Sequence, residues 1–323
     1  TLYDLNFPSN KNGNYVKSAM TLYENKVGAS DEVFSYLDLG FEKQRETFQN
    51  ATALYVYFEL YFADYKSGKS KNTIDQLLNK YSSVISLAEK NRKENSEKAD
   101  EFGRVIMSVN SLLIDVLNCK NLVPYCQKYL DTNKSDVFWL EVSAKALSSQ
   151  CKTEPVFFQI ASELYAIKPT SKSTYYLALY YLNTGKQDKA IEYFSESVTL
   201  ATDLLEKAKT AYTVASILAT TDKAKSNEMV LTAIKNEPTN GKYFIFLADL
   251  YASSVDECTS NVSEKNAVYK LASNTVLKAA TVEPRLKSTA EKLSLGYLKN
   301  SAPDSKKRKS VTIGCWINQK VQL

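Results

Sequence analysis

The side chains best suited to chemistry in this sequence are five cysteines, in a chain of 323 residues that has no histidine. The lack of histidine excludes Ser-His-Asp and Cys-His catalysis and any histidine-ligated metal. No two cysteines are separated by two residues, so the spacing of a metal knuckle or a redox dithiol is missing. We therefore expect no metal and no cofactor.

The charged residues point neither to an enzyme nor to a nucleic-acid partner. General acid-base catalysis needs carboxylates held in a pocket at a shifted pKa, and no paired-carboxylate motif is visible. The net charge of +5 is too small to argue for nucleic acid. The densest basic cluster, Lys306 to Lys309, could contact phosphates or lipid head groups, but a short charge run is usually only solvated.

Composition predicts an all-α fold. The chain is 44% hydrophobic, with only nine glycines and seven prolines, too few for the many turns of an all-β protein. No run approaches the ~20 apolar residues of a membrane helix. The sequence begins with Thr1 rather than methionine, so we expect that a preceding segment, either a signal peptide or a piece trimmed away, has been removed.

The stretch from Ser173 to Thr202 predicts two short helices joined by a turn at Gly185. Small and large apolar residues recur at offsets typical of a tetratricopeptide unit: Leu177, Ala178, Tyr181, Ala190 and Phe194. Such a helix pair buries its apolar stripe only against neighbouring pairs. We therefore predict a right-handed α-solenoid of antiparallel helix pairs.

Prolines mark the ends of further repeats. Pro169, Pro238 and Pro284 each follow a predicted second helix, and the first two are separated by close to two units of ~34 residues. Alignment on these prolines predicts buried crossing positions at Ile217, Val230, Ala233, Leu247, Ala248, Tyr251, Ala272 and Ala279. An extra loop is expected from Val255 to Lys265, although the turn Thr220-Thr221-Asp222 lacks the expected glycine.

The ends of the chain depart from this pattern. We expect divergent helical repeats over residues 1–118, the regular repeats over 119–300, and a loop with an extended tail over 301–323, all in one continuous solenoid. A helix pair is predicted from Glu97 to Asn118 and from Leu122 to Leu130. The tail alternates β-branched residues, which favours extended structure over helix.

The tail and the repeats together resemble a known family. The residues Gly314, Cys315, Trp316, Ile317 and Asn318 match the C-terminal Gly-Cys-Trp-Ile-Asn motif of a Bacteroidetes tetratricopeptide-repeat family. The resemblance extends from about Cys119 to the C-terminus and implies an extracytoplasmic protein of unassigned biochemical role. Cys126 and the missing full N-terminal repeats depart from that family.

The same resemblance bears on the cysteines. It implies disulfides between Cys119 and Cys151 and between Cys258 and Cys315, the latter joining the extra loop to the tail. Two separate buried thiols remain the alternative for Cys258 and Cys315. If both disulfides form, Cys126 is the odd, buried thiol.

Repeat geometry also predicts a binding surface. The inner face of each first helix lines the concave side of such a stack, which selects Tyr175, Leu179, Asn183, Lys242, Ile245 and Asp249. We expect these residues to bind a protein or peptide, with possible association with the cell envelope. A structural envelope protein without a discrete ligand is one alternative. An enzyme that uses Asp, Glu, Lys or Tyr of the same face is another. Most of the 22 tyrosines are expected to be interhelical core.

Overall fold

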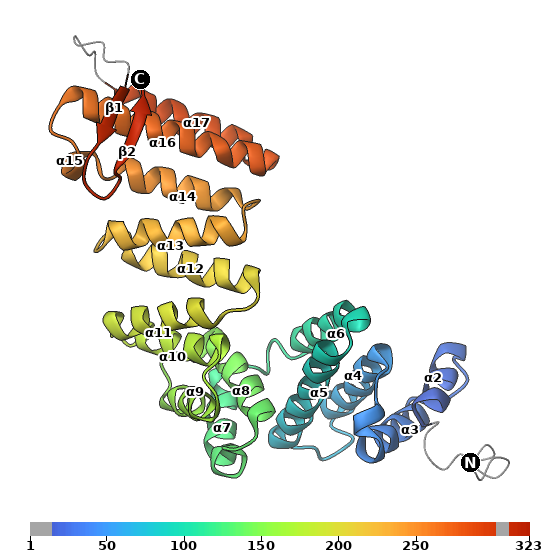
Figure 1. The fold of residues 1–323 in the computed structure, drawn as a ribbon. Coiled ribbons are helices and arrows are strands. Elements are labelled where there is room, and N and C mark those ends of the chain that lie inside the picture. Colours follow the sequence, from blue (N-terminus) through green and yellow to red (C-terminus); the bar gives the residue numbers. More distant parts are fainter. Residues whose placement is uncertain (1–14, 302–309) are drawn as a thin grey trace. The chain divides into compact units, whose positions relative to one another are not determined.

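The computed structural model describes residues 15–301 and 310–323 and is an all-α solenoid that ends in a short β-hairpin (Figure 1). It has two compact units, Thr1–Ile167 (unit 1) and Lys168–Leu323 (unit 2). The predicted division at residues 118 and 300 stays a prediction about the sequence. The basic cluster Lys306 to Lys309 and the first fourteen residues lie outside the described residues.

Unit 1 is a series of antiparallel helices. Its elements are α2 (Tyr15–Asn25), α3 (Ser30–Lys43), η2 (Arg45–Thr47), α4 (Ala51–Ser67), α5 (Ile74–Glu94), η3 (Ser96–Lys98), α6 (Ala99–Leu112), α7 (Cys119–Asn133), α8 (Val137–Gln150) and α9 (Pro155–Ile167). The pair predicted from Glu97 to Asn118 is only partly right, because α6 ends at Leu112 and turns occupy residues 113–118.

Local sequence explains where these helices begin and end. Gly68 adopts a left-handed conformation, with φ of 66°, and so ends α4. Thr73 and Gln76 form a capping box at the start of α5. Asp136 accepts the amide protons of Phe138 and Trp139 and so caps α8.

The core of unit 1 is built from aromatic rings. Tyr57 of α4 is buried, and its ring centroid lies 4.8 Å from that of Phe41 on α3. The Phe41 ring centroid in turn lies 6.0 Å from that of Phe48. The side-chain amide of Asn91 donates to the carbonyl oxygen of Phe48 at 2.9 Å, which satisfies a buried polar group on α5. Large rings therefore set the helix spacing here.

Unit 2 also consists of antiparallel helix pairs. Its elements are α10 (Ser171–Asn183), α11 (Gln187–Leu200), α12 (Leu204–Leu218), α13 (Lys223–Asn236), α14 (Gly241–Ala252), α15 (Val255–Cys258), α16 (Val262–Val282), η4 (Pro284–Leu286), α17 (Lys287–Lys299), β1 (Ser310–Ile313) and β2 (Gln319–Gln322). Gly185 has a φ of 75° in the turn between α10 and α11, as expected for the helix pair.

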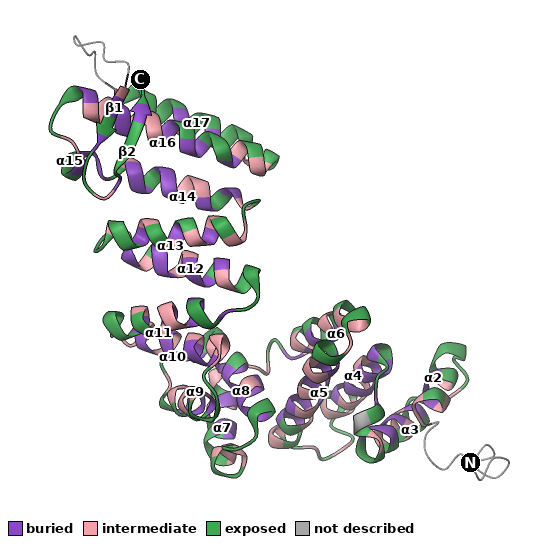
Figure 2. Cartoon of the chain, in the orientation of Figure 1, coloured by how far each residue is buried: buried purple, intermediate pink, exposed green. Residues whose placement is uncertain are grey.

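Alanines occupy the helix crossings of unit 2. Ala178, Ala190 and Ala248 are fully buried, as the repeat offsets predict, and small side chains there let the helices approach closely. Figure 2 shows buried residues, in purple, and exposed residues, in green, along each of these helices. The predicted burial of Ile217 is wrong: Ile217 is half-buried, whereas Leu218 is buried. The buried position on α12 therefore lies one residue later than the offset counted back from Pro238 predicts.

The C-terminal tail is a β-hairpin packed on unit 2. β1 pairs antiparallel with β2, with Val311 opposite Val321. Val311, Val321, Ile313 and Ile317 are buried in the same hydrophobic cluster as α14 and α16. The tail is therefore part of the core of this unit.

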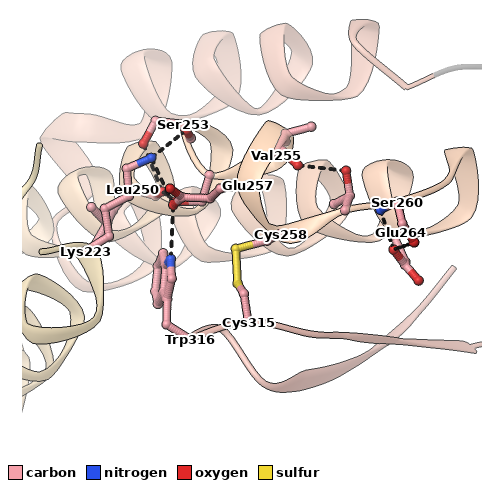
Figure 3. Close-up of a disulfide and its surroundings, with 12 residues drawn as sticks. Lys223, Leu250, Ser253, Val255, Glu257, Cys258, Ser260, Glu264, Cys315 and Trp316 are labelled. Carbon is pink, nitrogen blue, oxygen red and sulfur yellow. Dashed lines mark hydrogen bonds and ion pairs between the residues drawn. A yellow bond between two sulfur atoms is a disulfide. The ribbon is translucent and has the colours of Figure 1, made fainter.

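Both implied disulfides are present. Cys258 is bonded to Cys315, with a Cα–Cα distance of 5.2 Å, and this bond joins the loop after α14 to the hairpin (Figure 3). The expected extra loop is partly helical, because α15 occupies residues 255–258 and α16 already begins at Val262. Cys119 is bonded to Cys151 and so joins the start of α7 to the end of α8.

Cys126 is the free, buried thiol that the pairing leaves over. Burial raises the pKa of Cys126 to about 12, an effect that its hydrogen bond with Ser143 only partly offsets. The side chain therefore stays a neutral thiol at pH 7 and packs as a small apolar group.

Candidate binding surfaces

The predicted residues on α10 differ in how freely they can meet a partner. Tyr175 is half-buried, with its ring centroid 5.5 Å from that of Phe194 on α11. Leu179 is half-buried. Asn183 is exposed, and its side-chain amide donates to the Leu179 carbonyl oxygen at 2.7 Å, so part of its hydrogen-bonding capacity serves the helix end.

The predicted residues on α14 are a lysine, an isoleucine and an aspartate whose carboxylate already accepts a hydrogen bond. Lys242 is exposed and Ile245 is half-buried. Asp249 is exposed, but its carboxylate accepts a hydrogen bond from the hydroxyl of Tyr297 on α17. Burial raises the pKa of Tyr297 far above its usual value, and the hydrogen bond to Asp249 raises it further. Asp249 thus links α14 to α17 as well as facing outward.

The two predicted trios do not touch each other. Among the described residues, no hydrogen bond, ion pair or ring contact joins the three residues of α10 to the three of α14. The reason is the helix order: α12 and its partner α13 stand between the two pairs, with α12 packed on α11 and α14 packed on α13.

The intervening helix α12 supplies residues that the sequence prediction missed. The Tyr212 ring centroid lies 5.0 Å from that of Tyr243 and 5.3 Å from that of Phe246, so α12 and α14 are side by side. The Tyr243 hydroxyl donates to Glu237 at 2.6 Å. Burial raises the pKa of Tyr243, and this hydrogen bond raises it further. This ring cluster fixes the spacing of the two helices.

A regular offset could have found the missing residues. Each of α10, α12 and α14 has a buried alanine, with a lysine six positions before it, a half-buried apolar or tyrosine residue three before it, and a residue of intermediate or full exposure one after it. We define the repeat face as these nine residues: Lys172, Tyr175, Leu179, Lys209, Tyr212, Ser216, Lys242, Ile245 and Asp249. The position three before the alanine is thus half-buried in all three pairs, whereas the lysine and the position after the alanine are half-buried on α10 and exposed on α12 and α14.

Unit 1 contains a separate cleft that sequence reasoning did not predict. A cavity of ≈ 450 Å³ lies beside α5. Its lining residues are Arg45, Asn79, Ser82, Ser83, Ser86, Leu87, Lys90, Asn133, Asp136, Phe138 and Trp139. We call this cavity the α5 cleft. Its lining comes from η2, from α5, and from the end of α7 with the start of α8, which are far apart in the sequence.

Two further properties concern metals and membranes. Within residues 15–301 and 310–323, no group of three or more Cys, Asp or Glu side chains is placed to hold a metal ion. In the same residues, no helix has both the length and the apolar content needed to cross a bilayer.

Comparison with known proteins gives no family. No protein-family model matches the sequence, and no curated protein matches it. Among solved structures, the C-terminal part of a TPR repeat-containing protein from Cytophaga hutchinsonii is similar at 14% identity and a TM-score of 0.41, over 88% of this chain and 99% of that one. The TPR domain of P58(IPK) is similar at 11% identity and a TM-score of 0.24, over 90% of this chain and 93% of that one. Both TM-scores are below 0.5, so the repeat architecture rests on the helix pairs and buried alanines described above.

Proposed function

We propose that this protein is a non-enzymatic scaffold that binds a protein or peptide partner through the repeat face of unit 2. The observation that carries the proposal is the repetition itself. Three successive helix pairs keep a lysine, a half-buried side chain and a half-buried or exposed residue at equivalent positions around a buried alanine. An elongated partner can contact such equivalent positions on successive repeats.

The composition of the repeat face supports a macromolecular partner. Tyr175 and Tyr212 offer large ring surfaces with few rotatable bonds. Lys209 and Lys242 are exposed and add positive charge. Asp249, the one carboxylate of the face, already accepts a hydrogen bond from Tyr297. The partner surface is therefore expected to carry acidic groups opposite the lysines.

We also propose that the protein works outside the cytoplasm, in the cell envelope. The two disulfides support this location, because such bonds persist in oxidising compartments and are rare in the cytosol. Within this proposal, the disulfides hold the last hairpin and the α7–α8 pair in place while the repeat face stays open to a partner.

A pull-down from envelope extracts tests the proposal. The full chain should recover one protein in stoichiometric amount, and the double variant Lys209→Glu/Lys242→Glu should lose it. The matched control is Lys235→Glu/Lys278→Glu, which makes the same charge change at exposed positions of α13 and α16. Tyr175 and Asp249 are poor probes, because Tyr175 packs on Phe194 and Asp249 bonds Tyr297.

The outcomes separate the alternatives. Capture that is lost only in the repeat-face variant supports the scaffold. Equal capture by both variants moves the site elsewhere, and no stoichiometric partner at all favours a structural envelope protein.

A further inference from the structure

We propose that the α5 cleft of unit 1 is a second binding site, which takes an acidic segment of an extended polypeptide. It is separate from the repeat face, because every lining residue belongs to unit 1. Its volume of ≈ 450 Å³ falls within the roughly 300–1,000 Å³ of ligand-binding clefts.

Serine hydroxyls form the floor of the cleft. Ser82, Ser83 and Ser86 line the cavity from α5, and their hydroxyls make no hydrogen bond to any other described residue. Ser82 is only 6% exposed. Hydroxyls without a protein partner at an open cleft can be bonded by water or by a ligand. The floor is therefore ready to bond a polar ligand.

Arg45 places an oriented cation at the cleft. Its Nη2 atom donates to the Ser83 carbonyl oxygen at 3.0 Å, and its guanidinium lies 5.0 Å from the centroid of the Phe41 ring. These two contacts hold the planar group in position while leaving other N–H donors of the fork for a carboxylate.

The single carboxylate of the lining is compensated. Asp136 accepts the amide protons of Phe138 at 3.0 Å and of Trp139 at 3.1 Å, as the cap of α8. A carboxylate in this position is stabilised by the positive end of the helix. The lining therefore repels an incoming acidic group less than an uncompensated Asp would.

The walls of the cleft are fixed before any ligand arrives. The Tyr125 hydroxyl donates to the Asn79 side-chain oxygen at 2.8 Å, and the Trp139 indole donates to the same hydroxyl at 3.2 Å. Ion pairs Lys93–Glu141 and Lys145–Glu89 also join α8 to α5. A preformed site loses little free energy in ordering on binding.

The disulfide of unit 1 supports the same wall. It joins the two ends of the α7–α8 pair that lie away from the cleft, Cys119 and Cys151. The opposite end of the pair, with Asn133 and Asp136, lines the cavity. The bond therefore holds as one piece the helix pair that carries one side of the site.

Length and chemistry favour an extended peptide. The lining residues of α5 run from Asn79 to Lys90, a helix length of roughly 16 Å. An extended chain of about five residues has that length. Its backbone would offer donors and acceptors to the serines and asparagines, and an acidic side chain would pair with Arg45. Phe138, at 41% exposure, gives the rim an apolar contact.

Calorimetric titration of the full chain with small probes tests the proposal. The first probe is a blocked pentapeptide of alternating serine and glutamate, the second has glutamine in place of glutamate, and the third is maltopentaose. We expect the glutamate peptide to bind and the glutamine peptide to bind at least about tenfold more weakly, because charge-assisted hydrogen bonds are lost.

Matched variants locate the site. Arg45→Gln should weaken the glutamate peptide about tenfold or more, whereas Arg104→Gln, at an exposed position of α6, should not. Ser86→Phe, which fills the cavity, should abolish binding, with circular dichroism as the check that it folds. The Lys209→Glu/Lys242→Glu variant should bind the peptide as the parent does, so this test is independent of the repeat face.

Several results would overturn the proposal. They are no binding of the glutamate peptide, equal binding of its glutamine version, the same loss in both arginine variants, or binding of maltopentaose alone. The last result would assign the cleft to a neutral glycan. If Ser86→Phe fails to fold, the comparison of Arg45→Gln with Arg104→Gln decides the question alone.

Discussion

The two units solve the same packing problem with different side chains. Unit 1 fills its core with large rings, among them Phe58 and Phe102, both fully buried. Unit 2 brings its helices together through alanines such as Ala211 and Ala272. Alanine crossings impose one spacing on every pair, whereas rings of different orientation allow irregular spacing. The regular unit carries a repeated face, and the irregular unit carries a cleft.

Removal of a buried aromatic ring from unit 1 should have the largest effect on stability of the substitutions considered. Phe102→Ala should lower the free energy of unfolding by about 3–5 kcal/mol, because it leaves a cavity in a packed core. Denaturant unfolding monitored by circular dichroism measures this loss. Phe138→Ala is the control, since Phe138 is 41% exposed and should change stability by less than about 0.5 kcal/mol. Equal effects at both sites would show that the aromatic core is not packed as described.

Each unit should also depend on its own disulfide. The bonds close loops of 32 and 57 residues, and loss of either should cost up to about 4 kcal/mol in the chain-entropy model. Cys258→Ser/Cys315→Ser should destabilise the unit that contains the tail and leave unit 1 unchanged. Hydrogen exchange resolved by peptide distinguishes the two units. Faster exchange in unit 1 alone would contradict this assignment.

Counting thiols gives the same pairing a chemical test. The unfolded, non-reduced protein should react with a thiol reagent at one cysteine, Cys126. Five reactive thiols would remove both disulfides. They would also remove the main chemical support for a location outside the cytoplasm.

In unit 2, enlarging a buried alanine should destabilise the fold, as removing a buried ring does in unit 1. Ala190→Leu should overpack the α10–α11 crossing and cost about 1–3 kcal/mol, because Ala190 is fully buried. Lys189→Leu is the neighbouring control, at an exposed position of the same helix. Thermal melts of both variants measure the difference. An Ala190→Leu variant as stable as the parent would show that the repeat register is wrong.

The helix pairs of unit 2 were largely predictable from the sequence because alanines mark their crossings. A buried alanine tolerates little else, so Ala178 and Ala248 mark their helix pairs directly. The offset failed at Ile217, because the buried position of α12 lies one residue later, at Leu218, and composition alone does not show that shift. The α5 cleft had no such signal. Its serines look like ordinary surface residues of a helix, and only the fold brings Arg45 and Asp136 to the same cavity.

The tail should respond weakly to pH. Burial raises the pKa of Glu257, but hydrogen bonds from Lys223, Trp316 and Ser254 outweigh that effect and leave the pKa below its usual value. Figure 3 shows the contacts of Glu257 with Lys223 and Trp316. A carboxyl whose pKa is lowered by folding stabilises the folded state above its unfolded pKa. That stability is lost as the pH falls through the folded pKa.

The size of this effect should be small. Because the Glu257 side chain is 48% exposed, we expect less than about 1 kcal/mol between pH 7 and pH 3. Glu257→Gln should lose less stability over this range than the parent does. Identical pH profiles for the two proteins would show that the contact between Glu257 and Lys223 contributes nothing.

The most direct test of the proposed scaffold is hydrogen exchange of the full chain, alone and with the partner recovered by pull-down. The account predicts slower exchange in α10, α12 and α14, which carry the repeat face, and little change in α11 and α13. Slower exchange confined to α11 and α13, or to unit 1, would contradict the claim that the repeat face binds the partner.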